Sequence, residues 1–174
     1  MKRWIKVPLF LATALLAVSV SSSFSATAQT TSKDKAAIQA LEDRYNHGFN
    51  TKNVDAIMAC YAPGDGTFVF DAIPPREYPS WEAYKKDWEA LFANFPGPVT
   101  NTISEQSITV VGSVAYGHNI QSASFTQKDG AKKDLVLRVT DVYRKINGKW
   151  YIVQEHDSFP VDPGTGQADL LSKP

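Results

Sequence analysis

Several residue types that build particular classes of protein are scarce in this sequence. Its only cysteine is Cys60, so no disulfide can form within the chain. The three histidines are far apart, and together with a single thiol they lead us to expect no metal site. Basic and acidic side chains number 18 each, which leaves no broad positive field for a nucleic acid. What remains, within 174 residues of which 43% are hydrophobic, is one globular domain.

Long hydrophobic runs are also scarce, and the one near the N-terminus is short. It extends over residues 7–20, whereas an uncleaved membrane anchor needs about 20 consecutive apolar residues. Basic residues precede it, and the pattern Ala26-Thr27-Ala28 that follows suits signal peptidase. We therefore predict that residues 1–28 are a secretory signal peptide, that the protein is periplasmic or secreted, and that it has no membrane contact after cleavage.

The first half of the remaining chain has the pattern of helices. Apolar residues recur every three or four positions over residues 32–49, which predicts a first helix. Two shorter helices are expected after the capping residues Asn53 and Ser80, and the later one carries a stripe of aromatic side chains. A short strand, Phe68-Val69-Phe70, is expected between these two helices.

The second half has the pattern of strands. Turn residues such as Asn147-Gly148 separate stretches with strand-like composition, and Asn-Gly between two such stretches is a strong hairpin signal. The expected strands cover residues 102–111, 114–126, 133–146 and 149–159. Helices followed by an antiparallel meander predict an α+β fold with the helices on one face of a curved sheet. Residues 161–174, rich in Pro and Gly, are expected to be a flexible tail.

A series of short motifs follows this order of elements. The motifs are Leu41-x-x-x-Tyr45, Asn53-Val54-Asp55-Ala56-Ile57-x-x-x-Tyr61-Ala62, Phe70-Asp71, Arg138-Val139-Thr140-Asp141-Val142-Tyr143-Arg144-Lys145, Gly148-Lys149-Trp150-x-Ile152-Val153 and His156-x-Ser158-x-Pro160. Together they resemble the SnoaL-like domain family of the nuclear transport factor 2-like superfamily, also called ketosteroid-isomerase-like. The resemblance implies a cone-shaped roll over residues 29–160, with three N-terminal helices packed on a curved, mainly antiparallel sheet. It also implies a homodimer formed through the sheet.

The resemblance implies catalytic roles for three residues. Ketosteroid isomerases hold a dienolate oxygen with a Tyr and a protonated carboxylic acid, while a second carboxylate moves the proton. By position, Tyr45 and Asp141 match the two donors and Asp71 matches the base. No cofactor is implied.

Each of the three also has a structural interpretation. Tyr45 shares a helix face with core residues, and Asp71 precedes a turn that it could cap. Asp141 lies on the same strand face as Val139 and Tyr143 by alternation, and an acid on an apolar face favours a pocket position. Arg138 would then face the other way and either pair with an acid across the sheet or, after a bulge, bind a polar or anionic ligand.

The last strand offers two alternatives that one flat strand cannot satisfy together. His156 and Ser158 share parity with Trp150 and Ile152, which look like core positions, and His156 is the histidine best suited to acid–base work. Asp157 has the opposite parity, where the isomerase resemblance implies a pocket residue. The sequence leaves this choice open.

The aromatic content favours a flat, apolar ligand. Six large side chains are candidates for either the core or a ligand site, namely Phe49, Tyr61, Phe70, Trp81, Trp88 and Phe92. Two functions therefore remain. One is an exported, cofactor-free acid–base enzyme that acts on a small apolar carbonyl compound. The other is a non-catalytic module for ligand binding or dimerisation.

Overall fold

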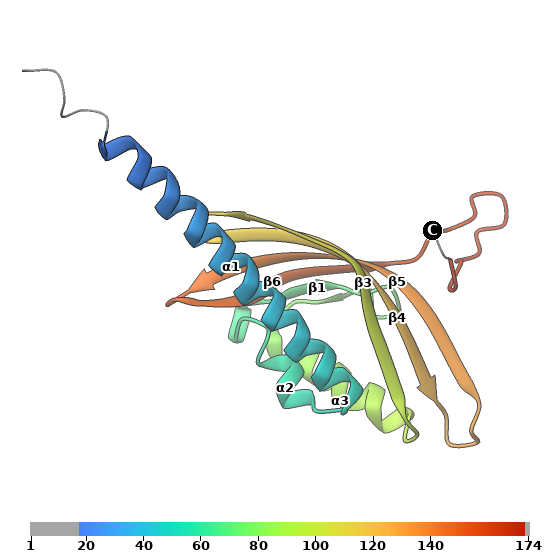
Figure 1. The fold of residues 1–174 in the computed structure, drawn as a ribbon. Coiled ribbons are helices and arrows are strands. Elements are labelled where there is room, and N and C mark those ends of the chain that lie inside the picture. Colours follow the sequence, from blue (N-terminus) through green and yellow to red (C-terminus); the bar gives the residue numbers. More distant parts are fainter. Residues whose placement is uncertain (1–17, 173–174) are drawn as a thin grey trace, which may run out of the picture.

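The computed structural model describes residues 18–172. The predicted signal peptide lies largely outside this range, and its residues 18–28 form the beginning of the first helix. That helix is therefore longer than the expected 32–49 and projects beyond the rest of the fold (Figure 1). Within the described part, no helix is both long enough and apolar enough to cross a membrane.

Three helices lie on one face of a six-stranded sheet (Figure 1). In chain order the elements are α1 (Val18–Asn50), α2 (Val54–Met58), the 3-10 turn η1 (Gly64–Gly66), β1 (Phe68–Phe70), β2 (Glu77–Tyr78), α3 (Trp81–Asn94), β3 (Val99–Val111), β4 (Val114–Thr126), β5 (Lys132–Ile146) and β6 (Lys149–Ser158). The strand order is β2-β1-β6-β5-β4-β3, and only β1 and β6 are parallel neighbours. The predicted α+β class and the mainly antiparallel sheet are confirmed.

Local signals explain where the two short helices begin. The Asn53 side chain accepts a hydrogen bond from the backbone N of Ala56 at 3.0 Å, and Ser80 accepts one from Ala83 at 3.2 Å. Each cap satisfies a backbone donor that the first helical turn leaves unpaired. Helices α2 and α3 are tied to each other because Trp81 Nε1 donates to the carbonyl of Met58 at 2.8 Å.

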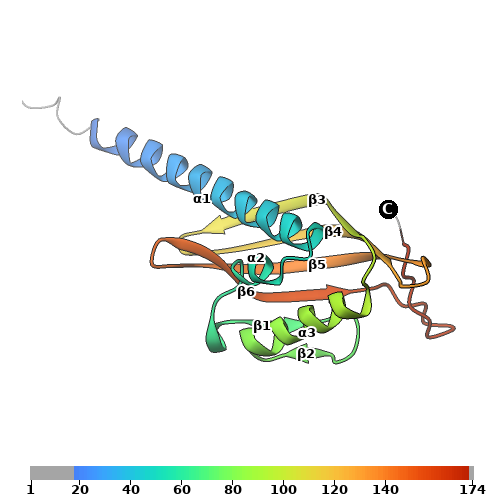
Figure 2. The same cartoon turned by 90° about the horizontal axis from the view of Figure 1, so that it is seen from below.

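Helices α1 and α3 cover different parts of the sheet (Figure 2). Helix α1 runs along the β3 side, where Asn50 exchanges hydrogen bonds with the backbone of Asn101 at 2.6 and 3.1 Å. Helix α3 lies on the side of β1 and β2. The inner face between them holds the core, in which rings of α1 and α3 meet edge to face, as Phe49 and Trp88 do with centroids 5.5 Å apart.

A β-bulge in β6 decides which residues of that strand face the core. Tyr143 of β5 pairs with Ile152, but the preceding Val142 pairs with Gln154, so Val153 is an extra residue. Side chains on a strand alternate between faces, and an extra residue reverses the alternation beyond it. Trp150 and Ile152 are therefore buried before the bulge, and Glu155 is buried after it.

The segment after Pro160, expected from sequence to be a flexible tail, folds back against the sheet as far as residue 172. The carbonyl of Leu170 accepts a hydrogen bond from Val136 N of β5 at 2.8 Å, and Pro160 accepts one from Asp169 N at 2.8 Å. The Asp162 side chain fixes the intervening turn by accepting from Gly164 N at 2.7 Å.

Candidate functional site

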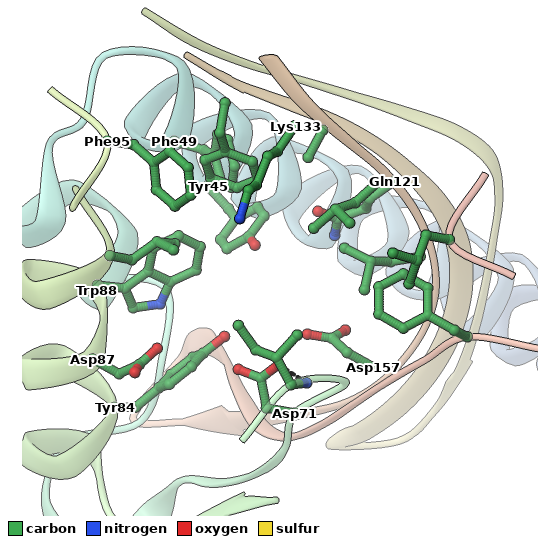
Figure 3. A pocket seen from close by; sticks show the side chains of 18 residues that line it. Tyr45, Phe49, Asp71, Tyr84, Asp87, Trp88, Phe95, Gln121, Lys133 and Asp157 are labelled. Atoms are coloured by element: carbon green, nitrogen blue, oxygen red, sulfur yellow. Dashed lines mark hydrogen bonds between the residues drawn. The ribbon is translucent and has the colours of Figure 1, made fainter. Parts of the chain in front are cut away.

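A cavity of about 310 Å³ opens between the C-terminal half of α1, helix α3 and strands β4 to β6 (Figure 3). This volume lies at the lower end of the range for small-molecule sites. Much of its wall is apolar, and the main apolar residues are Phe49, Trp88, Leu91, Phe95, Phe125 and Leu135. The polar lining consists of Tyr45, Asp71, Tyr84, Asp87, Gln121, Lys133 and Asp157.

Tyr45 lies on the face of α1 that points toward the cavity, one turn before Phe49 (Figure 3). Its side chain is buried, and the structure records no hydrogen bond from its hydroxyl to the described residues. Burial, reinforced by the negative charge of Glu155, raises the pKa of Tyr45 well above its usual value. The phenol therefore stays protonated and has a hydrogen to donate into the cavity.

Asp71 follows strand β1 and lies at the lower edge of the cavity (Figure 3). Its Oδ1 accepts a hydrogen bond from Ile73 N at 3.0 Å, so it caps the turn as well as lining the pocket. Burial raises the pKa of Asp71 to about 6, with a further contribution from the charge of Asp87, and the bond from Ile73 acts in the opposite direction. The carboxyl is mostly ionised at neutral pH but can be protonated within the physiological range.

Asp157 reaches the cavity from β6 (Figure 3). Its Oδ1 is buried and has no hydrogen-bond partner among the described residues. Burial, followed by the charges of Glu155 and Asp71, raises the pKa of Asp157 well above that of an ordinary aspartate. Burial therefore favours the protonated form of this carboxyl, which could donate a hydrogen bond to a ligand.

Tyr84 of α3 lines the cavity and is fixed from behind by Glu155 of β6. The Tyr84 hydroxyl donates to Glu155 Oε1 at 2.8 Å, and the Tyr61 hydroxyl donates to Oε2 at 2.6 Å. Burial raises the pKa of Glu155, whereas these two hydrogen bonds lower it. Glu155 and the role of Tyr84 were not identified from sequence, because the bulge at Val153 gives Glu155 its inward position.

A second group of polar side chains, the enclosed cluster, lies on the inner face away from the cavity. It consists of Glu42, Asn119, Asp141 and Tyr143. Tyr143 Oη lies 2.9 Å from Glu42 Oε1 and 3.3 Å from Asp141 Oδ2, which also accepts from Asn119 at 3.3 Å. A phenol has one hydrogen, so one of the two acids must carry a proton and donate back. Burial raises the pKa of Glu42 to about 7 and that of Asp141 well above its usual value.

The prediction that Asp141 lines the pocket is corrected by this arrangement. Asp141 does face inward, as the alternation predicted, but its neighbours on the sheet and on α1 enclose it, and it is not part of the cavity wall. The second pocket carboxyl is instead Asp157. The bulge therefore settles the open choice in β6 in favour of Asp157 over His156.

Three other predicted polar residues lie outside the cavity wall. His156 is exposed and packs against the ring of Phe70, with centroids 5.7 Å apart. Arg138 is exposed and donates to the carbonyl of Phe159 at 3.0 Å, and Ser158 donates to the carbonyl of Arg138 at 3.5 Å. These residues stabilise the end of β6 and do not converge on a ligand.

Some of the predicted aromatic residues line the cavity and others lie outside its wall. Phe49 and Trp88 line the cavity. Tyr61 is buried behind it against Glu155, Trp81 joins α2 to α3, and Phe70 is 37% exposed. Within residues 18–172 no three His, Cys, Asp or Glu side chains are grouped as metal ligands.

Gln121 is a pocket residue that sequence reasoning missed. Its Oε1 accepts a hydrogen bond from Asn101 Nδ2 at 2.8 Å, and its side chain lines the cavity (Figure 3). Its signal in the sequence is that Asn119 and Gln121 both fall on the inward parity of β4, between Gly117 and Ala123.

Comparison with known proteins adds a family and a fold. The model of the SnoaL-like domain matches residues 38–162. A nuclear transport factor 2-like protein of unknown function from Pseudomonas putida is 26% identical, with a TM-score of 0.74 over 82% of this chain and 98% of its own. A superfamily protein from Salmonella enterica is 20% identical, with a TM-score of 0.70 over 80% and 99%. A protein from Novosphingobium aromaticivorans, provisionally named a scytalone dehydratase, is 17% identical, with a TM-score of 0.68 over 84% and 99%. Among curated proteins, none matches the chain significantly.

Proposed function

The chain belongs to the SnoaL-like domain family, and on that premise we propose that its pocket binds a small, largely apolar carbonyl compound and transfers a proton on it. The observation that carries this proposal is the pair of acids in one apolar cavity. Asp71, with a pKa of about 6, is mostly ionised at neutral pH, whereas burial and the charges of Glu155 and Asp71 shift the pKa of Asp157 upward, toward its protonated form. Two carboxyls with different protonation states can serve as base and as hydrogen-bond donor.

The proposed step uses residues of this chain alone. The carboxylate of Asp71 removes a proton from the carbon next to the ligand carbonyl, and the electron pair moves onto the carbonyl oxygen. Tyr45 and Asp157 donate hydrogen bonds to that oxygen as its negative charge develops. The proton then returns from Asp71 to carbon, and Asp71 is again ionised. A positioned base of this kind accelerates proton transfer by roughly 10²–10⁴-fold.

Deuterium exchange tests this step directly. The protein is incubated in heavy water with tetralone, a bicyclic aromatic ketone, and deuterium at the carbon next to the carbonyl is followed by mass spectrometry. We expect exchange above the buffer rate and a loss of roughly 100-fold in Asp71→Asn, because an amide cannot act as the base. The matched control is Asp65→Asn, which makes the same change at an exposed residue six positions earlier. Equal exchange rates in the protein and in buffer would contradict the proposal.

A second candidate function is ligand binding without catalysis. It is favoured by the hydrogen bond from Ile73 N to Asp71 Oδ1, which gives this carboxyl a structural role in the turn. Calorimetric titration with tetralone separates the two functions. Binding without exchange supports the binding module, and exchange that depends on Asp71 supports the enzyme.

The name of one solved structure is in keeping with acid–base chemistry. The Novosphingobium protein of the same fold is provisionally named a dehydratase. At 17% identity this likeness extends to the fold, and the proposal for the present chain depends on its own Tyr45, Asp71 and Asp157.

A further inference from the structure

Three residues of the cavity wall are exposed to solvent, and they mark the mouth of the cavity. They are Ile73, Lys133 and Leu170, whereas the other lining residues are buried or half-buried. Ile73 and Leu170 are apolar, so the charge at the mouth comes from the lysine. Among the lining residues that the structure describes, Lys133 is also the one that carries a positive charge.

The position of Lys133 in β5 directs its side chain toward the cavity. Lys133, Leu135 and Leu137 occupy alternate positions of the strand, and all three line the wall. Lys133 pairs with Phe125 of β4, which also belongs to the wall. The ammonium of Lys133 therefore extends over the cavity (Figure 3). The preceding residue, Lys132, has the opposite parity and does not line the cavity.

Within residues 18–172, Lys133 forms no ion pair. The acids of the wall, Asp71, Asp87 and Asp157, lie on the side of the cavity opposite to it (Figure 3). Burial is the main cause of the raised pKa of Asp71 and of Asp157. The charge of Asp87 contributes to the raised pKa of Asp71, and the charge of Asp71 to that of Asp157, so the three acids lie near one another. The cavity therefore has its acids on one side and an unpaired cation on the other.

This distribution of charge suits a ligand with an anionic group at one end. Resting on the proposed function, we propose that the ligand is a carboxylated ketone. Its apolar body with the carbonyl fills the cavity, and its carboxylate binds the ammonium of Lys133 at the mouth. The acids on the opposite side repel the carboxylate, so the charges also set the orientation of the ligand, with the carbonyl toward Asp71 and Asp157.

Two ketones that differ in charge test the role of Lys133. Carboxytetralone carries a carboxylate on the ring opposite the ketone, and its carboxamide carries a neutral group of similar size at the same position. Their affinities for the full chain are measured by calorimetry at neutral pH and low salt. We expect the carboxylate to bind about fivefold more tightly than the carboxamide, as an ion pair with an exposed lysine allows. In Lys133→Gln this ratio falls to about one.

Lys132→Gln is the matched control. It removes the same charge from the neighbouring residue but leaves the cavity wall unchanged, because Lys132 does not line the cavity. The preference for the carboxylate should therefore persist in Lys132→Gln. Because each ratio compares two ligands on one protein, a general loss of stability does not produce it.

The outcomes separate this inference from the proposed function. If tetralone binds and exchanges but the carboxylate adds no affinity over the carboxamide, or if its added affinity survives in Lys133→Gln or is lost equally in Lys132→Gln, the inference is overturned and the proposed function stands. If the preference depends on Lys133 but no ketone is exchanged, the inference stands and the proposed proton transfer is overturned. If none of the three ketones binds, both are overturned.

Discussion

The pocket and the enclosed cluster are two groups of buried acids on the same face of one sheet, and they differ in what surrounds them. In the enclosed cluster, Tyr143 and Asn119 supply hydrogen bonds to Glu42 and Asp141, although Asp141 Oδ1 and Asn119 Oδ1 have no partner among residues 18–172. In the pocket, the hydroxyl of Tyr45 and the carboxyl of Asp157 face a cavity. Burial raises the pKa of acids in both regions. A raised pKa by itself therefore does not mark a functional site, whereas a polar group that faces open space does.

The comparison also separates stability from function. A polar side chain whose partners are all within the protein contributes to folding, and its loss leaves those partners unsatisfied. A polar side chain whose partner is a ligand contributes little to the free energy of unfolding, and its removal mainly lowers the affinity for that ligand. The three predictions below test this separation.

The largest effect is expected from the pH dependence of stability set by Glu42. Its pKa is about 7 in the folded protein and 4.5 in the unfolded chain, so the folded state binds more protons between these values. The free energy of unfolding therefore falls as the pH rises from 4.5 to 7, by about 3 kcal/mol from this group. Glu42→Gln removes that part of the decline, which urea denaturation at pH 5 and pH 8 would measure.

Glu89→Gln is the control for this prediction, because it makes the same change at an exposed helix residue of α3. It should lose stability with rising pH as the wild type does. An equal decline in Glu42→Gln and in the wild type would show that Glu42 is not held protonated by its surroundings.

The same substitution in the two regions should give opposite results. Tyr143→Phe removes the hydroxyl that contacts both Glu42 and Asp141, and we expect the free energy of unfolding to fall by about 2 kcal/mol. Tyr45→Phe removes a hydroxyl that has no recorded hydrogen-bond partner within residues 18–172, and stability should change by less than about 0.5 kcal/mol.

Calorimetry with tetralone completes that comparison. Tyr45→Phe should weaken binding about tenfold, and Tyr143→Phe should leave it nearly unchanged. A variant of Tyr143 that binds as weakly as Tyr45→Phe would mean that the enclosed cluster and the pocket act as one unit.

The smallest effect is expected at Leu170, where the C-terminal segment meets the cavity. Leu170 lines the cavity but remains 42% exposed, so Leu170→Asn should weaken tetralone binding by roughly threefold. Its neighbour Leu171 is 57% exposed and is not part of the wall, so Leu171→Asn should have no effect on affinity. Equal losses in both variants would indicate that the segment contributes through its backbone rather than through the Leu170 side chain.

Much of the fold could be predicted because its signals are local. The capping residues Asn53 and Ser80 begin helices as expected, and the Asn147-Gly148 turn joins the last two strands. Strand β2 was missed because two residues carry no periodicity. The resemblance to the family supplied Tyr45 and Asp71, and both line the cavity.

The rest of the site could not be predicted because it depends on contacts between distant segments. Glu42 is followed by Asp43 and Arg44 and has the appearance of an ordinary charged helix residue, yet it is buried against β5. Asp141 has the inward parity expected of a pocket residue, but only the packing around it shows that it is enclosed. In β6, no residue type in the sequence predicts the bulge at Val153.

That bulge has a consequence for how this protein could change over time. Before Val153 the inward side chains of β6 are Trp150 and Ile152, and after it Glu155 and Asp157 face inward. An unbulged pairing of the same sequence would turn both acids toward solvent and bring His156 inside, whereas deleting Val153 would leave both acids inside, because Gln154 would then follow Ile152 in simple alternation. The bulge could therefore be lost by deletion of Val153 without a change in the charge of the binding site.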